Sequence, residues 1–260
     1  MLLEHKNAVI YGAGGAIGGA VARAFSREGA RVFLAGRTLA PIDATAREIA
    51  AAGGAAEAAQ VDALDQQAVE RHLDAVAEKA GAVDISFNAI GFKELQGVPL
   101  IELALEDFLY PIMAWSRTVF LTGRAAARRM VRQGSGVILT INAPSDEAVP
   151  LAGGFGAACA TVEALSRNLA AEVGPRGVRV VCLQPNAVPE SAALRESVAQ
   201  HARGIGVTPE EMLASLASET LLRRLPTLAE VADVAAFMAS DQASAMTGTV
   251  IKINCGALVD

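Results

Sequence analysis

Short apolar runs alternate with segments of helical periodicity along most of the chain. The first run covers residues 7–11 and ends at Gly12, and apolar residues then recur at helical spacing from Ile17 to Phe25. Further candidate strands lie at residues 31–35, 58–62, 83–87, 136–141, 178–183 and 249–253. Near-continuous apolar runs of this length are typical of parallel strands that are covered on both faces.

Helical segments occupy the intervals between these runs. They are predicted at about residues 39–52, 102–131, 155–173 and 227–239, with a further helix that follows Asp65 as its N-cap. Thr208 with Glu211, and Thr227 with Glu230, have the spacing of a capping box at two helix starts. Strands that alternate with crossover helices predict an α/β fold, a Rossmann-type doubly wound parallel sheet of about seven strands. No linker divides the chain, so residues 1–260 are expected to form a single domain.

Composition narrows the class of protein. Hydrophobic residues make up 52% of the 260 residues, which provides a large core and excludes general disorder. A net charge of −6 argues against binding to nucleic acid, and no uninterrupted apolar stretch predicts a membrane-spanning helix. Cys159, Cys182 and Cys255 are far apart, and the histidines show no metal spacing, so we expect a cytoplasmic protein without a metal site.

A glycine-rich turn, GAGGAIGG from Gly12 to Gly19, separates the first strand from the first helix. Small residues permit a tight turn, and the N–H groups at the start of the helix can then face a pyrophosphate. Glycine also serves turns that bind no ligand, but the order strand, turn, helix, strand is the one that a dinucleotide site requires. The following residues are therefore expected at the cofactor: Gly12, Gly14, Gly15, Ile17 and Gly18.

The end of the second strand bears on the choice of cofactor. Sites that prefer NAD place an acidic residue near this point, where it holds the ribose 2′-hydroxyl. This chain has Gly36 and Arg37 there, and a guanidinium can bind a 2′-phosphate. The pattern favours NADP(H) over NAD(H), and the alternative is an arginine that only contacts solvent in a loop.

Motifs later in the chain follow the order of a known enzyme family. Asp62 comes after the third strand, Asn88-Ala89-Ile90-Gly91 after the fourth, and Gln184-Pro185 after the sixth. Together with the glycine turn, these motifs resemble the short-chain dehydrogenase/reductase family over essentially the whole chain. The resemblance implies an oxidoreductase with a nicotinamide cofactor, and it adds these cofactor-binding residues: Asp62, Asn88, Ala89, Gly91 and Pro185.

The chain departs from the family at the catalytic residues. The family's proton-donating tyrosine, and the lysine that binds the nicotinamide ribose, align with Phe155 and Cys159. The serine that polarises the substrate carbonyl aligns with Asn142 or Ala143, and the asparagine of the fourth helix aligns with Trp115. We therefore expect a nonstandard catalytic centre, in which Asn142 donates a hydrogen bond to the substrate and Phe155 and Trp115 form apolar walls.

Other residues are candidates for a replacement acid. Asp146 and Glu147 follow the fifth strand, although acidic residues in exposed loops are common. Cys159 lies one turn into a helix, whose N-terminus can lower a thiol pKa, but a buried packing cysteine is the alternative. In the family, the segment after the sixth strand covers the substrate, which corresponds to residues 187–216 of this chain.

Two functions remain open from the sequence. The first is an oxidoreductase that transfers hydride between NADP(H) and a small carbonyl compound or an activated alkene. The second is a catalytically silent nucleotide-binding or scaffold protein. The resemblance implies a homotetramer or homodimer, and the segment 108–120 supports it because apolar residues cover more of this helix than a core-facing stripe requires.

Overall fold

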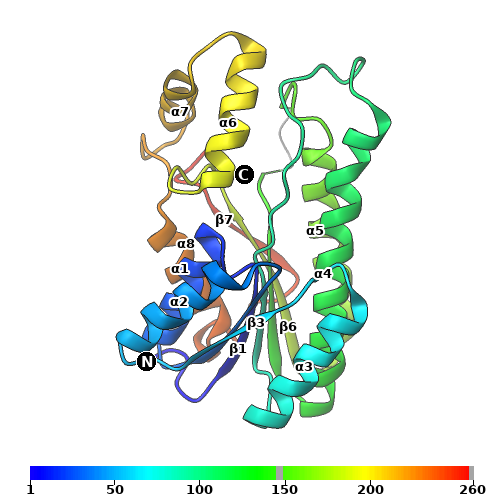
Figure 1. Ribbon diagram of the computed structural model, residues 1–260, viewed down its shortest axis with the longest axis vertical. Coiled ribbons are helices and arrows are strands. Elements are labelled where there is room, and N and C mark those ends of the chain that lie inside the picture. Colours follow the sequence, from blue (N-terminus) through cyan, green and yellow to red (C-terminus); the bar gives the residue numbers. More distant parts are fainter. Residues whose placement is uncertain (145–148, 258–260) are drawn as a thin grey trace.

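The computed structural model describes residues 1–144 and 149–257. In this part of the chain, seven strands form one parallel sheet in the order β3-β2-β1-β4-β5-β6-β7 (Figure 1). Their bounds are β1 (Asn7–Tyr11), β2 (Arg31–Gly36), β3 (Ala56–Gln60), β4 (Ile85–Asn88), β5 (Gly136–Ile141), β6 (Val178–Pro185) and β7 (Thr249–Ile253). The predicted doubly wound parallel sheet is confirmed.

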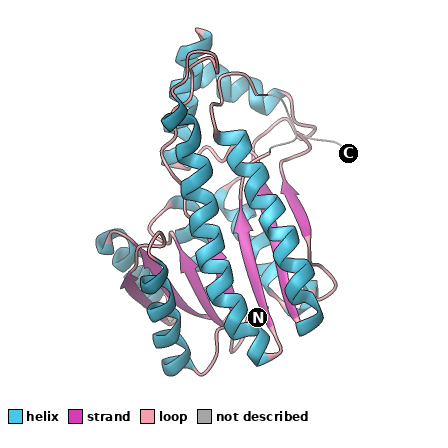
Figure 2. Cartoon of the chain, turned by 90° about the vertical axis from the view of Figure 1, so that its right-hand side faces the viewer, coloured by secondary structure: helices cyan, strands magenta, loops and turns pink. Residues whose placement is uncertain are grey.

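Eight α-helices accompany the sheet in the described residues. They are α1 (Ala16–Arg27), α2 (Leu39–Ala51), α3 (Gln66–Ala80), α4 (Leu105–Gln133), α5 (Phe155–Val173), α6 (Ala192–Ile205), α7 (Pro209–Ser218) and α8 (Leu228–Ala239). One face of the sheet is covered by α1, α2 and α8, and Figure 2 looks onto the other face, which α3, α4 and α5 cover. The α6–α7 pair lies beyond the carboxyl ends of the strands (Figure 1).

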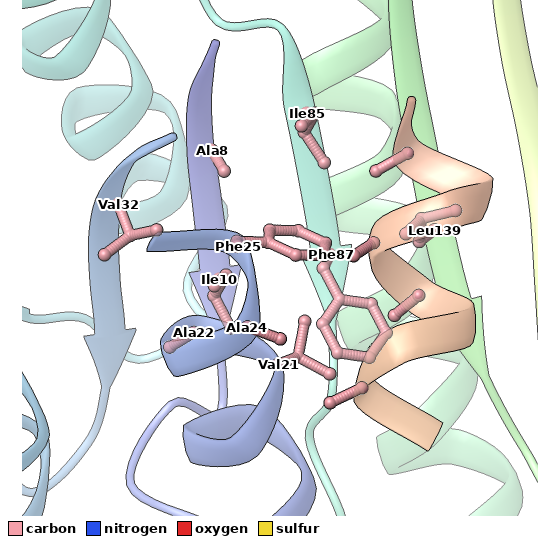
Figure 3. Close-up of a cluster of buried hydrophobic side chains, with 14 of the residues drawn as sticks. Ala8, Ile10, Val21, Ala22, Ala24, Phe25, Val32, Ile85, Phe87 and Leu139 are labelled. Atoms are coloured by element: carbon pink, nitrogen blue, oxygen red, sulfur yellow. The ribbon is translucent and has the colours of Figure 1, made fainter. Parts of the chain in front are cut away.

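Successive residues of each central strand point into two separate apolar layers. Ile10 of β1 and Phe87 of β4 pack with Phe25 of α1 in the first layer (Figure 3), whereas Val9 and Tyr11 of β1 lie in the second. Both layers exclude water, so the central strands are mostly apolar on both faces instead of alternating between apolar and polar residues. This burial explains why their positions could be predicted from continuous apolar runs.

The predicted edge strand is displaced by two residues. It was expected at residues 58–62, and β3 covers Ala56–Gln60 instead. Because β3 lies at the edge of the sheet, its residues are only partly buried, and Glu57 forms ion pairs with Arg31 and Lys79. A partly exposed edge strand that contains a charged residue has no continuous apolar run to mark its start.

The predicted helix starts are confirmed by their hydrogen bonds. Asp65 accepts hydrogen bonds from two N–H groups of the first turn of α3. Complete capping boxes join Thr208 to Glu211 at α7, and Thr227 to Glu230 at α8.

Within residues 1–144 and 149–257, no helix is both long and apolar enough to cross a membrane, and no group of His, Cys, Asp and Glu residues could hold a metal ion.

Candidate functional site

A cleft of about 240 Å³ opens at the carboxyl ends of the strands, beside β1 and β4. The chain leaves β1 for a helix on one face of the sheet and leaves β4 for a helix on the other, so the two connections diverge. Such a switch point is where doubly wound folds bind ligands. The cleft includes these residues predicted from the sequence: Gly12, Gly14, Gly15, Arg37, Asp62, Ala89 and Gly91.

Four predicted cofactor residues do not line this cleft. Ile17 and Gly18 lie in the first turn of α1, and Pro185 ends β6, on the far side of β5. Asn88 is buried, with Nδ2 donating to Thr122 Oγ1 (2.9 Å) and Oδ1 accepting from the Ile90 N–H (3.1 Å). Asn88 therefore fixes the turn that brings Ala89 and Gly91 to the cleft.

The glycine turn has the geometry of a phosphate cradle. Gly12 has φ of +79°, and a Cβ atom there would lie 2.6 Å from the carbonyl oxygen of Ala89. Gly15 is the N-cap of α1 and offers no side-chain acceptor, so the first N–H groups of this helix remain for a ligand. Ala16, where the family has glycine, lies inside α1 with no positive φ, and its methyl group is accommodated.

The other end of the cleft combines a cation with an apolar wall. Arg37 is exposed on the rim, and its guanidinium forms no ion pair with the rest of the described chain. Asp62 follows β3, the strand next to β2, and also lines the cleft, with Oδ1 accepting from the Leu64 N–H (3.0 Å). Pro41 and Ile42 of α2 supply an apolar surface that the sequence analysis missed, because nothing in the local sequence marks it. These features fit the phosphates, ribose and base of a dinucleotide.

The positions aligned with the family's catalytic residues do come together. Trp115 of α4 and Phe155 of α5 are in contact, with ring centroids 5.7 Å apart and ring planes tilted by 34°, and Cys159 belongs to the same buried cluster. Phe92 packs against this cluster and also lines the cofactor cleft, so the two are adjacent. Trp115 Nε1 is buried and has no hydrogen-bond partner among the described residues. The first turns of this face of α5, at Phe155 and Cys159, are therefore apolar.

Cys159 is a packing residue and not an activated thiol. Its side chain is fully buried, and this burial raises the pKa of the thiol to about 12. The thiol consequently stays protonated at neutral pH. The loss of hydration on burial raises its pKa by more than the helix N-terminus can lower it. Asp146 and Glu147, the other candidate acids, lie outside the described residues.

Asn142 belongs to a buried polar network. Its Nδ2 group donates to Glu163 Oε1 (2.8 Å) and to the Cys159 carbonyl oxygen (3.3 Å), and Gln184 Nε2 also donates to Glu163 Oε1 (2.8 Å). Both amide hydrogens of Asn142 thus have protein partners, and a substrate oxygen would have to displace one of them. Glu163 was not among the predicted residues, although its position four residues after Cys159 on α5 is a usable signal.

The segment predicted to cover the substrate contacts the loop that follows β4. Ser197 Oγ of α6 donates to Glu94 (3.0 Å), and the Gln96 N–H donates to Gln200 Oε1 of the same helix (3.1 Å). These bonds hold α6 above the carboxyl ends of the strands, on the side where Phe92 reaches the apolar cluster.

Gly18→Ala should destabilise the fold by about 1–3 kcal/mol, the usual cost of overpacking. A Cβ atom at Gly18 would lie 2.3 Å from the Gly12 carbonyl oxygen, so the turn must move. Gly156→Ala on α5 is the control, because a Cβ there meets no other atom within 4 Å. The midpoint of urea denaturation measures the stability of each variant. Equal midpoints for the two variants would contradict the cradle geometry.

Thiol labelling at pH 8 should modify only Cys255 in the folded protein. Cys159 and Cys182 are fully buried, and burial raises the pKa of both thiols to about 12, which leaves about one thiolate in ten thousand at that pH. All three cysteines should react in denaturant. Rapid labelling of Cys159 in the native protein, located by peptide mass mapping, would show that it is reactive.

Known proteins share this architecture over their whole length. Residues 12–257 match the family model described as Enoyl-(Acyl carrier protein) reductase. Galactitol 2-dehydrogenase (L-tagatose-forming) of Cereibacter sphaeroides is 31% identical over 264 residues, which cover 99% of this chain and 96% of the relative. D-threitol dehydrogenase of Mycolicibacterium smegmatis is 30% identical over 262 residues, which cover 98% of this chain and 93% of the relative.

A solved structure of NAD+-bound xylitol dehydrogenase matches with a TM-score of 0.93 at 23% identity, covering 98% of this chain and 100% of that one. The similarity in fold therefore extends to a protein whose structure contains a nicotinamide cofactor. With the sequence relatives and the switch-point cleft, it leads to one assignment: the chain is an oxidoreductase of the short-chain dehydrogenase/reductase family.

Proposed function

We propose that the protein binds NADP(H) and transfers a hydride to a small acceptor, without the proton donor of its family. One contrast carries the proposal: the phosphate cradle at Gly12 and Gly15 is intact, whereas Phe155 makes the catalytic face of α5 apolar. The N–H groups at the start of α1 would hold the pyrophosphate, Arg37 a 2′-phosphate, and Asp62 the adenine. A bound nicotinamide supplies the hydride.

The missing acid decides which acceptors suit the site. Reduction of a ketone leaves an alkoxide, and a positioned acid is typically worth about 10²–10⁴-fold in rate for such a proton transfer. Phe155 has no proton to give, and the amide of Asn142 is engaged by Glu163. An alkene conjugated to a carbonyl group accepts hydride at carbon and leaves a delocalised anion that water can protonate. Activated alkenes are therefore better acceptors for this site than simple carbonyl compounds.

Two further parts of the proposal concern the surroundings of the site. Residues 187–216, which include α6, cover the substrate, and the hydrogen bonds that join Ser197 and Gln200 to the loop after β4 support this position.

The alternative function, nucleotide binding without catalysis, is supported by the contact between Trp115 and Phe155, which fills space where the family's polar groups act.

The function is tested by following NADPH oxidation with matched ketones and α,β-unsaturated ketones, beside a thermal-shift measurement of cofactor binding. NADPH at 100 times its dissociation constant should stabilise the fold by about 2.7 kcal/mol. Unsaturated ketones should react at least about 10²-fold faster than the saturated ones. Binding without any turnover would establish the silent alternative, and equal rates for both classes would show that an acid is present.

Arg37→Ala should reduce the preference for NADPH over NADH by about tenfold or more, since it removes the unpaired guanidinium at the cleft rim. NADH affinity should change little, because NADH has no 2′-phosphate. Arg47→Ala on the outer side of α2, where Arg47 pairs with Asp43, is the control. If the ratio of the dissociation constants of NADPH and NADH is the same in wild type and Arg37→Ala, Arg37 does not determine the cofactor preference.

Self-association is proposed through α4 and α5. Leu109, Met113 and Phe120 are exposed along one face of α4, at the spacing of a helix contact. We expect a dimer or tetramer in light scattering at micromolar concentration, and a smaller mass for Met113→Glu. Gln67→Glu adds the same charge on α3 and should leave the mass unchanged. A monomeric wild-type protein would refute this part of the proposal.

A further inference from the structure

The chain holds few aromatic residues, eight Phe, two Tyr and one Trp, and four of them meet in one place. Phe92 and Tyr110 contact edge to face with ring centroids 6.3 Å apart, and the tilted rings of Trp115 and Phe155 have centroids 5.7 Å apart. Phe92 joins the two pairs because it also packs against the buried cluster that contains Trp115. We refer to Phe92, Tyr110, Trp115 and Phe155 as the aromatic group.

A carboxylate lies near Tyr110, at one end of the aromatic group. Glu94 is two residues after Phe92 and shares with Tyr110 a cleft of about 770 Å³ between the loop after β4, α4 and α6. It accepts hydrogen bonds from Ser197 Oγ and Gln96 Nε2, both at 3.0 Å. These two neutral donors hold the side chain in place without neutralising its charge.

Glu94 has no ion-pair partner among the described residues. Lys93, its neighbour, pairs with Glu196 at 3.1 Å, and Arg203 lines the same cleft beyond ion-pair distance of Glu94. Partial burial raises the pKa of Glu94, because the carboxylate has lost part of its hydration. A cation placed next to it would restore the missing stabilisation.

A series of contacts connects Glu94 with the catalytic position: Glu94 shares a cleft with Tyr110, Tyr110 contacts Phe92, and Phe92 packs against the cluster that contains Cys159. Burial is the main cause of the raised pKa of the Cys159 thiol, and the carboxylates of Glu163 and Glu94 contribute to it. The family has a lysine at position 159, whose positive charge would repel a cationic substrate. This chain has a neutral cysteine there, beside aromatic faces, which attract cations.

We propose that the hydride acceptor is a cation with a carbon–nitrogen double bond, an iminium ion or protonated imine, held by the aromatic group and Glu94. The proposal rests on the hydride transfer proposed above and names its substrate class. It accounts together for the unpaired carboxylate, the four aromatic rings and the loss of the lysine.

The chemistry of such an acceptor requires no acid from the protein. The hydride brings its electron pair to the iminium carbon and forms a C–H bond, while the π pair of the C=N bond moves to nitrogen as a lone pair. The nicotinamide is oxidised and takes the positive charge, and the iminium ion is reduced to a neutral amine. No proton is transferred in this step, so Phe155 at the tyrosine position is no obstacle.

Binding can be measured without cofactor, because Trp115 is the single tryptophan and its fluorescence reports on the site. The probe is an N-methylated dihydroisoquinolinium ion, and its control is the neutral hydrocarbon in which carbon replaces the nitrogen. The cation should bind about tenfold more tightly than the neutral isostere, as cation–π contacts and a nearby carboxylate imply. Equal affinities for the two compounds in the wild-type protein would overturn the proposal.

Variants identify the groups responsible. Glu94→Gln keeps the hydrogen-bonding shape and should abolish most of the preference for the cation, whereas Glu196→Gln, the paired neighbour, should preserve it. Phe155→Leu should weaken binding of the cation but not of the isostere. If Glu94→Gln retains the full preference, this carboxylate is not the counter-charge and the proposal is wrong.

Turnover separates this inference from the function on which it rests. With NADPH present, the iminium ion should be reduced faster than an α,β-unsaturated ketone of similar size. NADPH oxidation with the ketone, but no preference for the cation in binding or turnover, would overturn only the substrate class. Preferential cation binding without any NADPH oxidation would instead contradict the proposed hydride transfer.

Discussion

The close approach of the chain after β1 to the chain after β4 is the constraint on which the site depends. The Ala89 N–H donates to the Tyr11 carbonyl oxygen at 2.9 Å, and this bond brings the two connections together one residue before Gly12. Only a glycine fits at position 12, since a Cβ would collide with the Ala89 carbonyl group. The cleft exists because the two connections then diverge to opposite faces of the sheet, and both Arg37 and Asp62 are placed around it.

The two halves of the site differ in chemical character. The half around the glycine turn has backbone donors, an exposed guanidinium and an apolar wall around one cleft. In the half around α5, Phe155 and a fully buried Cys159 occupy the positions that we align with the family's acid and cation, and Phe155 contacts the Trp115 ring. The proposed function follows from this contrast: hydride delivery is kept, and the acceptors are those that need little help with a proton.

Much of this arrangement could be predicted from the sequence. Continuous apolar runs located the central strands because both faces of the sheet are buried. The predicted bounds of the edge strand were two residues off because its partly buried residues, Glu57 among them, form no such run. The i and i+4 spacing placed Phe155 and Cys159 on one face of α5 before the structure was known. Local sequence carried no comparable signal for Ile42 in the cleft wall.

The network of Asn142, Glu163 and Gln184 could not be predicted either. Its hydrogen bonds join β5, α5 and β6, and they depend on the register of all three elements, which no short motif encodes. The same reason applies to Glu94, whose partner Ser197 is about a hundred residues away in the chain.

A crystal structure of the complex with NADP+ tests the central claim most directly. The adenosine and its 2′-phosphate should lie between Arg37 and Asp62, with the nicotinamide beside the Phe155 ring and no tyrosine hydroxyl or lysine ammonium within hydrogen-bond distance of it. A cofactor bound outside the Gly12 cleft, or another tyrosine and lysine beside the nicotinamide, would contradict the account.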